Sequence, residues 1–138
     1  MKRKISLGKG LNSVEGESWV FNKDVAKIFD LHVKQSLPFY DSIQKYISSL
    51  SEWFIKDNSI IYDLGCSTGE TAKNIFEFNR KRKIKFNYVG LDNSPPMIKL
   101  ANKKIKNKNI KFKVADINKV SFKKNSDLFI CLLTFPFL

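Results

Sequence analysis

Short apolar runs alternate with helical stripes through the second half of the chain. Four of these runs predict buried strands, at Ile60–Leu64, Phe86–Asp92, Ile110–Ala115 and Leu128–Thr134. Between them, Glu70–Asn79 carries apolar residues three and four positions apart, and Ser94-Pro95 supplies the cap and first turn of another helix. This order predicts a parallel α/β sheet with right-handed crossovers. The fourth run is nearly all apolar, as expected for a parallel strand covered on both faces.

Two more helices are predicted ahead of the first strand. Asn22 is the expected N-cap of Lys23–Gln35, and Pro38 separates this helix from Tyr40–Phe54. Apolar residues at helical spacing define the expected inward faces. These residues are Val25, Ile28, Phe29 and Val33 on the first helix, and Ile43, Tyr46, Ile47, Leu50 and Phe54 on the second.

The length of 138 residues and the hydrophobic content of 43% fit one domain with its own core. Residues 1–18 are basic and lack periodicity, which predicts a mobile arm ahead of a domain over 19–138. Within that domain, we expect a helical lid over 19–56 and an α/β half over 57–138. The sequence has no apolar run that could span a membrane, and no apolar stretch follows the basic N-terminus as in a signal peptide.

The charged and sulfur-containing residues limit the partners that we expect. A net charge of +12 raises the prospect of nucleic-acid binding, but the basic residues are mostly Lys interleaved with Asn and Ile, and only three are Arg. A solvated basic surface is therefore favoured, with a direct nucleic-acid footprint as the alternative. Cys66 and Cys131 lie far apart in the sequence and predict neither a disulfide nor a metal site, which favours a reducing cytoplasm.

Three acidic residues end three successive predicted strands, namely Asp63, Asp92 and Asp116. A single aspartate at such a place is often a turn former. Three in register predict a ligand site, because open parallel sheets bind ligands at the carboxyl ends of their strands. We expect an adenosine-containing cofactor, with Asp92 on the ribose hydroxyls and with Asp116 and the backbone of Ile117 at the adenine edge.

A small-residue turn, Gly65 to Gly69, follows the first strand. Gly65 and Gly69 would let the backbone approach a ligand, and Ser67 takes the middle position where a third glycine is often found. Cys66 is interpreted as a small residue that fits the turn and not as a nucleophile, because no His is near it in sequence. The spacing differs from the Gly-x-Gly-x-x-Gly of dinucleotide folds, which disfavours a dinucleotide-dependent oxidoreductase.

Asp63-Leu-Gly-Cys-Ser-Thr-Gly69 resembles motif I of the class I S-adenosylmethionine-dependent methyltransferases, and the resemblance continues at Asp92 and Asp116. Further segments resemble the carboxy-S-adenosylmethionine synthase branch of that superfamily. These segments are Trp19-Val-Phe21, Val25-Ala26, Phe29, Ser36-Leu-Pro38, Tyr40, Tyr62-Asp-Leu-Gly-Cys-Ser67, and Asp92-Asn-Ser-Pro95 with Met97. The resemblance implies a Rossmann-like, doubly wound and mostly parallel sheet. It also implies a cofactor site lined by Tyr40, Gly65, Cys66, Ser67, Asp92, Asn93, Asp116 and Ile117.

The same resemblance implies S-adenosylmethionine or its carboxylated form as cofactor, prephenate as small-molecule substrate, and a place in tRNA wobble-uridine modification. The match departs at Leu132, where the family has an Asn that contacts the cofactor. The family's Arg for the cofactor carboxylate lies beyond position 138. An ordinary small-molecule or tRNA methyltransferase, and a non-catalytic remnant that binds the cofactor, are therefore kept as alternatives. We predict no catalytic residue, and a homo-oligomer is left open.

The family's sheet has seven strands, and this chain supplies four before it ends on the apolar residues Phe135 to Leu138. We therefore expect a fold cut after the fourth strand, either in an N-terminal portion of a longer protein or in a truncated gene product. Phe135-Pro136-Phe137 follows that strand, where either substrate contact or core packing is expected. His32 is expected to cap a helix or to make an interhelical hydrogen bond.

Overall fold

The computed structural model describes residues 23–123 and 125–134. The predicted arm, the Asn22 cap and the Phe135–Phe137 segment lie outside the described residues. In chain order the elements are α1 (Lys23–Ser36), α2 (Tyr40–Ser51), β1 (Ile60–Leu64), α3 (Glu70–Asn79), the 3-10 turn η1 (Arg80–Arg82), β2 (Asn87–Asp92), α4 (Pro95–Lys104), β3 (Ile110–Val114), the 3-10 turn η2 (Ile117–Lys119) and β4 (Leu128–Ile130). None of the described helices is long and apolar enough to cross a membrane.

The four strands form one parallel sheet in the order β3-β2-β1-β4, which confirms the predicted α/β fold class. β1 lies inside the sheet, where Tyr62 pairs with Val89 on one side and Phe129 on the other. β4 is shorter than predicted and ends at Ile130. Its continuation leaves the ladder because Leu133 adopts a left-handed backbone, with φ 58°, and the Thr134 hydroxyl donates to the Leu64 carbonyl at 2.8 Å.

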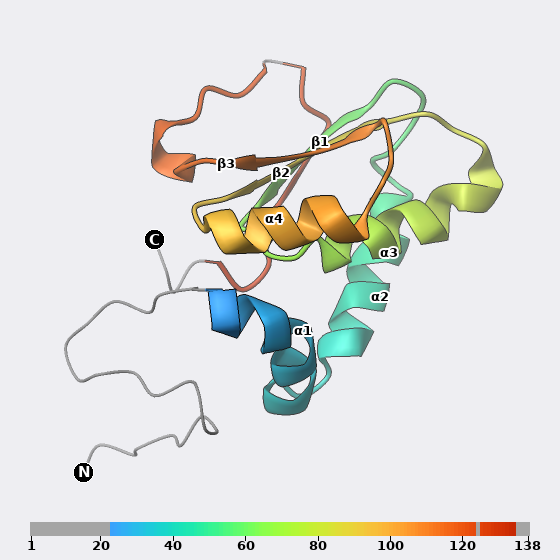
Figure 1. Ribbon diagram of the computed structural model, residues 1–138. Coiled ribbons are helices and arrows are strands. Elements are labelled where there is room, and N and C mark those ends of the chain that lie inside the picture. Colours follow the sequence, from blue (N-terminus) through green and yellow to red (C-terminus); the bar gives the residue numbers. More distant parts are fainter. Residues whose placement is uncertain (1–22, 124, 135–138) are drawn as a thin grey trace, which may run out of the picture.

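The apolar core fills the space between the sheet and the helices α3 and α4, which lie on the same side of it (Figure 1). Every second residue of each strand faces these helices, as strand geometry requires. Thus Ile61 and Tyr88 are fully buried against a core that also contains Ile75 of α3 and Ala101 of α4. The link between β3 and β4 covers the other side, where Phe122 packs edge-on against Tyr62 and Phe129.

The predicted inward stripe of α2 is only partly correct, since Ile47 alone of its residues packs against the core. The helix ends at Ser51, before Phe54, and Tyr46 is 66% exposed. Its buried residues are instead Tyr40, Gln44, Ser48 and Ser51. Short polar side chains let α2 approach α3 closely and exchange hydrogen bonds with it, such as the one from Asn79 Nδ2 to Ser51 Oγ at 3.1 Å. Satisfied polar contacts of this kind replace the apolar packing that the periodicity predicts.

α1 lies across the end of the sheet and is attached through polar contacts. Asp30 accepts hydrogen bonds from the buried Thr68 hydroxyl and from Lys104 Nζ, the latter at 2.6 Å. Lys104 Nζ also lies 3.5 Å from Glu70 Oε2. These polar contacts together connect α1 to α3, to α4 and to the turn before α3. The predicted inner face is only partly correct, because Val33 is buried whereas Ile28 is 42% exposed.

Gly90 on β2 provides a test of how tightly the sheet packs beneath the turn. A Cβ at this position would lie 2.6 Å from Phe112 Cδ1 and 2.8 Å from Cys66 Sγ. We expect Gly90→Ala to lower the free energy of unfolding by roughly 1–3 kcal/mol through overpacking, as measured by urea denaturation. The control Asn87→Ala, at an exposed position of the same strand, should change it by less than about 0.5 kcal/mol. Equal stability of the two variants would contradict this packing.

Candidate functional site

A cavity of about 480 Å³ opens at the carboxyl ends of the strands, between the sheet, α1 and α2. The sheet contributes Asp63, the turn after β1, Asp92, and Leu132 to Thr134 after β4. Every site residue predicted from the sequence lines it except Gly69. These nine are Tyr40, Asp63, Gly65, Cys66, Ser67, Asp92, Asn93, Asp116 and Ile117.

The Asp92 carboxylate joins the turn after β1 to the turn after β2 at the floor of the cavity. Its Oδ2 accepts the Ser67 N–H and its Oδ1 accepts the Ser94 N–H, each at 2.9 Å. Burial raises the pKa of Asp92, and these two backbone bonds partly oppose the rise. Ser67 has a φ of 50°, in the left-handed region that favours glycine. The bond to Asp92 helps to hold a serine in a conformation that usually belongs to glycine.

The two glycines of the turn have different roles. Gly65, with φ 79°, lies on the cavity wall under the side chain of Thr134, which a Cβ would overlap. Gly69, with φ 82°, is the N-cap of α3, and a Cβ there would lie 2.8 Å from Phe112 Cζ. Gly69 is therefore required for helix entry and close packing. It does not line the cavity, and the expected approach of its backbone to a ligand stays a prediction.

Asp63 is 1% exposed and lies at the base of the cavity. Its Oδ2 accepts a 2.6 Å hydrogen bond from the hydroxyl of Tyr88 on β2, and among the described residues its Oδ1 has no partner. Burial raises the pKa of Asp63 to about 7, although the Tyr88 bond opposes the shift and the nearby Asp92 charge adds to it. The role of Tyr88 could not be predicted from the sequence, because its side chain lies in the core and its position follows the apolar pattern of the strand.

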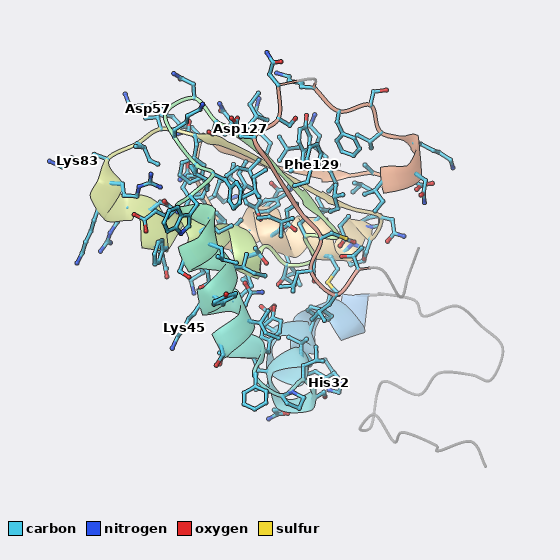
Figure 2. The ribbon with its side chains drawn as sticks, turned by 180° about the vertical axis from the view of Figure 1, so that it is seen from behind. His32, Lys45, Asp57, Lys83, Asp127 and Phe129 are labelled. Carbon is cyan, nitrogen blue, oxygen red and sulfur yellow. The ribbon has the colours of Figure 1, made fainter. Side chains whose placement is uncertain are left out.

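Asp116 combines a capping role with a place on the cavity wall. It is the N-cap of η2, where Oδ1 accepts the Asn118 N–H at 3.0 Å, and Oδ2 lies 3.1 Å from Lys119 Nζ. The Asn118 bond and the lysine lower the pKa of Asp116, so this exposed carboxylate is ionised at neutral pH. The two acids at the opposite end of the sheet, Asp57 and Asp127, each accept a backbone N–H and lie far from His32 (Figure 2).

Helices α2 and α3 contribute side chains that the sequence analysis missed. Gln44 and Thr71 line the cavity, and Gln44 Nε2 lies 3.0 Å from the Tyr40 hydroxyl. Burial raises the pKa of Tyr40 to about 12, so this phenol stays protonated. His32 Nε2 shares a 3.1 Å hydrogen bond with Ser36 of the same helix, so the expected cap or interhelical bond is wrong. Gln44 escaped notice because the helical pattern placed it on the polar face.

The charged groups on the wall are all acidic. Four carboxylic acids line the cavity, and within the described chain no Lys or Arg does so. These acids are Asp63, Glu70, Asp92 and Asp116. Cys66 is buried, and burial raises the pKa of its thiol, so it is not a ready nucleophile. No group of three potential metal ligands occurs in the described part of the chain. The site therefore favours an organic ligand that carries positive charge.

Comparison with known proteins agrees with this geometry. A family described as "Methyltransferase domain" matches residues 61–138. The chain belongs to this methyltransferase family. Its match begins at the central strand and includes the glycine turn and all three strand-end acids.

Two curated relatives have the same name. The carboxy-S-adenosyl-L-methionine synthase of Staphylococcus epidermidis is 31% identical over 121 residues, which are 87% of this chain and 51% of that enzyme. The enzyme of the same name from Sulfurimonas denitrificans is 35% identical over 120 residues, which are 86% of this chain and 49% of the enzyme. The chain thus spans about half the length of the curated relatives it matches.

Solved structures share the fold of this methyltransferase chain. A putative S-adenosyl-L-methionine-dependent methyltransferase from Methanococcus maripaludis superposes with a TM-score of 0.68 at 20% identity, over 91% of this chain and 57% of that one. The plantazolicin methyltransferase BpumL, in complex with SAH, superposes with a TM-score of 0.59 at 26% identity, over 83% and 44% of the two chains. The likeness confirms a Rossmann-like methyltransferase fold.

The buried Asp63 predicts how stability depends on pH. The folded state retains a proton that the unfolded state releases from about pH 4, so the free energy of unfolding should fall as pH rises to about 7. The fall should reach at most about 4 kcal/mol. Urea denaturation across this range would measure it. Asp63→Asn keeps a partner for Tyr88 and should remove most of the slope, leaving the smaller part due to Asp92, whereas an unchanged slope would contradict the assignment.

Proposed function

We propose that the chain binds S-adenosylmethionine in this cavity and forms the cofactor-binding half of a transferase. The observation that carries the proposal is a wall with four carboxylic acids and, among the described residues, no Lys or Arg. S-adenosylmethionine carries a sulfonium and an ammonium, and both cations are favoured by such a wall. BpumL, which shares the fold, was solved in complex with SAH.

Each end of the cofactor has a counterpart on the wall. Asp92 would accept hydrogen bonds from the ribose hydroxyls, because each carboxylate oxygen has a lone pair beyond its bond to Ser67 or Ser94. Asp116 and Ile117 would hold the adenine edge, and the turn Gly65 to Ser67 would bring backbone against the cofactor. Helices α1 and α2 would act as a lid over the cofactor, and α2 supplies Tyr40.

The cofactor, when bound, supplies an electrophilic carbon attached to a sulfonium. The described residues would bind it, orient it and exclude water, which is the main contribution that positioning makes to group transfer. By the relatives' names, the whole protein would be a carboxy-S-adenosylmethionine synthase. We extend the proposal, on the sequence resemblance alone, to prephenate as second substrate and to tRNA wobble-uridine modification in the cytoplasm. An ordinary methyltransferase is the second candidate, favoured by the apolar Leu132 on the cavity wall.

Calorimetry with three ligands tests the cofactor class. We expect heat on titration with S-adenosylmethionine and with S-adenosylhomocysteine, because both carry the adenosyl and ammonium groups that the wall accepts. NAD should give none, since its pyrophosphate is anionic and the cavity is acidic. Binding of NAD alone would overturn the proposal.

The role of Asp92 in binding the ribose can be separated from its role in holding the two turns. Asp92→Ala should weaken binding of S-adenosylhomocysteine by roughly 1.5–3 kcal/mol, because the ribose loses a charged acceptor. The analogue of S-adenosylhomocysteine that lacks the ribose hydroxyls should bind wild type and variant almost equally, as measured by calorimetry. If Asp92→Ala weakens both ligands to the same extent, Asp92 acts only by holding Ser67 and Ser94.

A further inference from the structure

One corner of the acidic cavity offers hydrogen-bond donors. Gln44 of α2, only 3% exposed, contacts two hydroxyl groups there. Its Nε2 lies 3.0 Å from the Tyr40 hydroxyl and 3.2 Å from Thr71 Oγ1. All three residues line the cavity, and both hydroxyl-bearing residues are buried. We call Tyr40, Gln44 and Thr71 the hydroxyl corner.

The amide of Gln44 sets the direction of both hydrogen bonds. An amide nitrogen can only donate, so the two hydroxyl oxygens must accept from it. Its Oε1 faces the other way and accepts from Asn74 Nδ2 of α3 at 3.4 Å, which fixes the orientation of the amide. Tyr40 and Thr71 therefore each keep a proton that they can donate elsewhere.

Neither of these protons has an acceptor among the described residues. A buried donor without an acceptor costs free energy, which a ligand with two acceptor oxygens would recover. Tyr40 also remains a neutral donor at physiological pH, because burial disfavours its ionised form and raises its pKa. A carboxylate has the two acceptor oxygens that the corner needs.

We propose that Gln44 is a positioning residue that turns Tyr40 and Thr71 into a pair of donors for a carboxylate, namely the α-carboxylate of the cofactor's amino-acid tail. The inference rests on the proposed adenosyl cofactor and deepens it. Asp63 in its ionised form supplies the complementary group, since its Oδ1 is then a buried acceptor without a partner among the described residues and can take the α-ammonium. The wall would thus recognise both charges of the tail without a Lys or Arg from the described part of the chain.

The matched ligands are S-adenosylhomocysteine and its decarboxylated analogue, S-adenosyl-3-thiopropylamine, which lacks only the α-carboxylate. Wild type should bind the first at least ten-fold more tightly in calorimetry. Gln44→Glu is nearly isosteric, but its carboxylate accepts from Tyr40 and Thr71 and so consumes both donors. We expect this variant to lose most of the preference for the carboxylated ligand, by ten-fold or more.

Gln35→Glu is the control, because it adds the same charge at an exposed position on α1. It should keep the wild-type preference. Tyr40→Phe and Thr71→Val each remove one donor without adding charge, and each should reduce the preference about three-fold or more. These two variants carry the test if Gln44→Glu fails to fold, as judged by its melting temperature.

Two results would count against the inference in different ways. If wild type binds the two ligands equally, or if Gln44→Glu, Tyr40→Phe and Thr71→Val leave the preference unchanged, the hydroxyl corner does not bind a carboxylate and the adenosyl cofactor stands. If wild type binds neither ligand, the cofactor assignment itself is wrong.

Discussion

The carboxylate of Asp92 is the contact on which the geometry of this site depends. It holds the N–H of Ser67 on one turn and the N–H of Ser94 on the next. Beside it, the Leu91 carbonyl accepts the N–H groups of Gly65 and Cys66 at 2.8 and 2.9 Å. The end of β2 therefore sets the path of the turn that leaves β1. Without these bonds, the strained backbone of Ser67 would have little to keep it in place.

Polar groups buried around the Asp92 carboxylate fall into two kinds. Ser51 and Asn79 exchange a hydrogen bond between α2 and α3, and so do Gln44 and Thr71, and these bonds hold the two helices together. Others retain an unused bonding capacity toward the cavity, as Asp63 does. Because satisfied groups surround the unsatisfied ones, their orientation is fixed before a ligand arrives, which lowers the ordering cost of binding.

The sequence predicted the sheet, α3, α4 and the strand-end acids, because each depends on local periodicity or on strand order. Ser94 caps α4 by accepting from the Met97 N–H, as its position ahead of Pro95 indicated. Residues whose roles depend on tertiary partners could not be predicted. Gln44 matters through Thr71, 27 positions away, and Tyr88 through Asp63, 25 positions away. The early end of β4 likewise depends on a contact with Leu64, 70 positions from Thr134.

The contrast between a net charge of +12 and an acidic cavity has a kinetic consequence. A cation approaching from a distance meets the repulsion of the lysine-rich exterior, and it is attracted only once it enters the mouth. Salt shortens the range of the outer field to about 8 Å at physiological ionic strength and affects the enclosed acids much less. Capture of a cationic cofactor should therefore become faster as salt is added, the reverse of ordinary electrostatic steering.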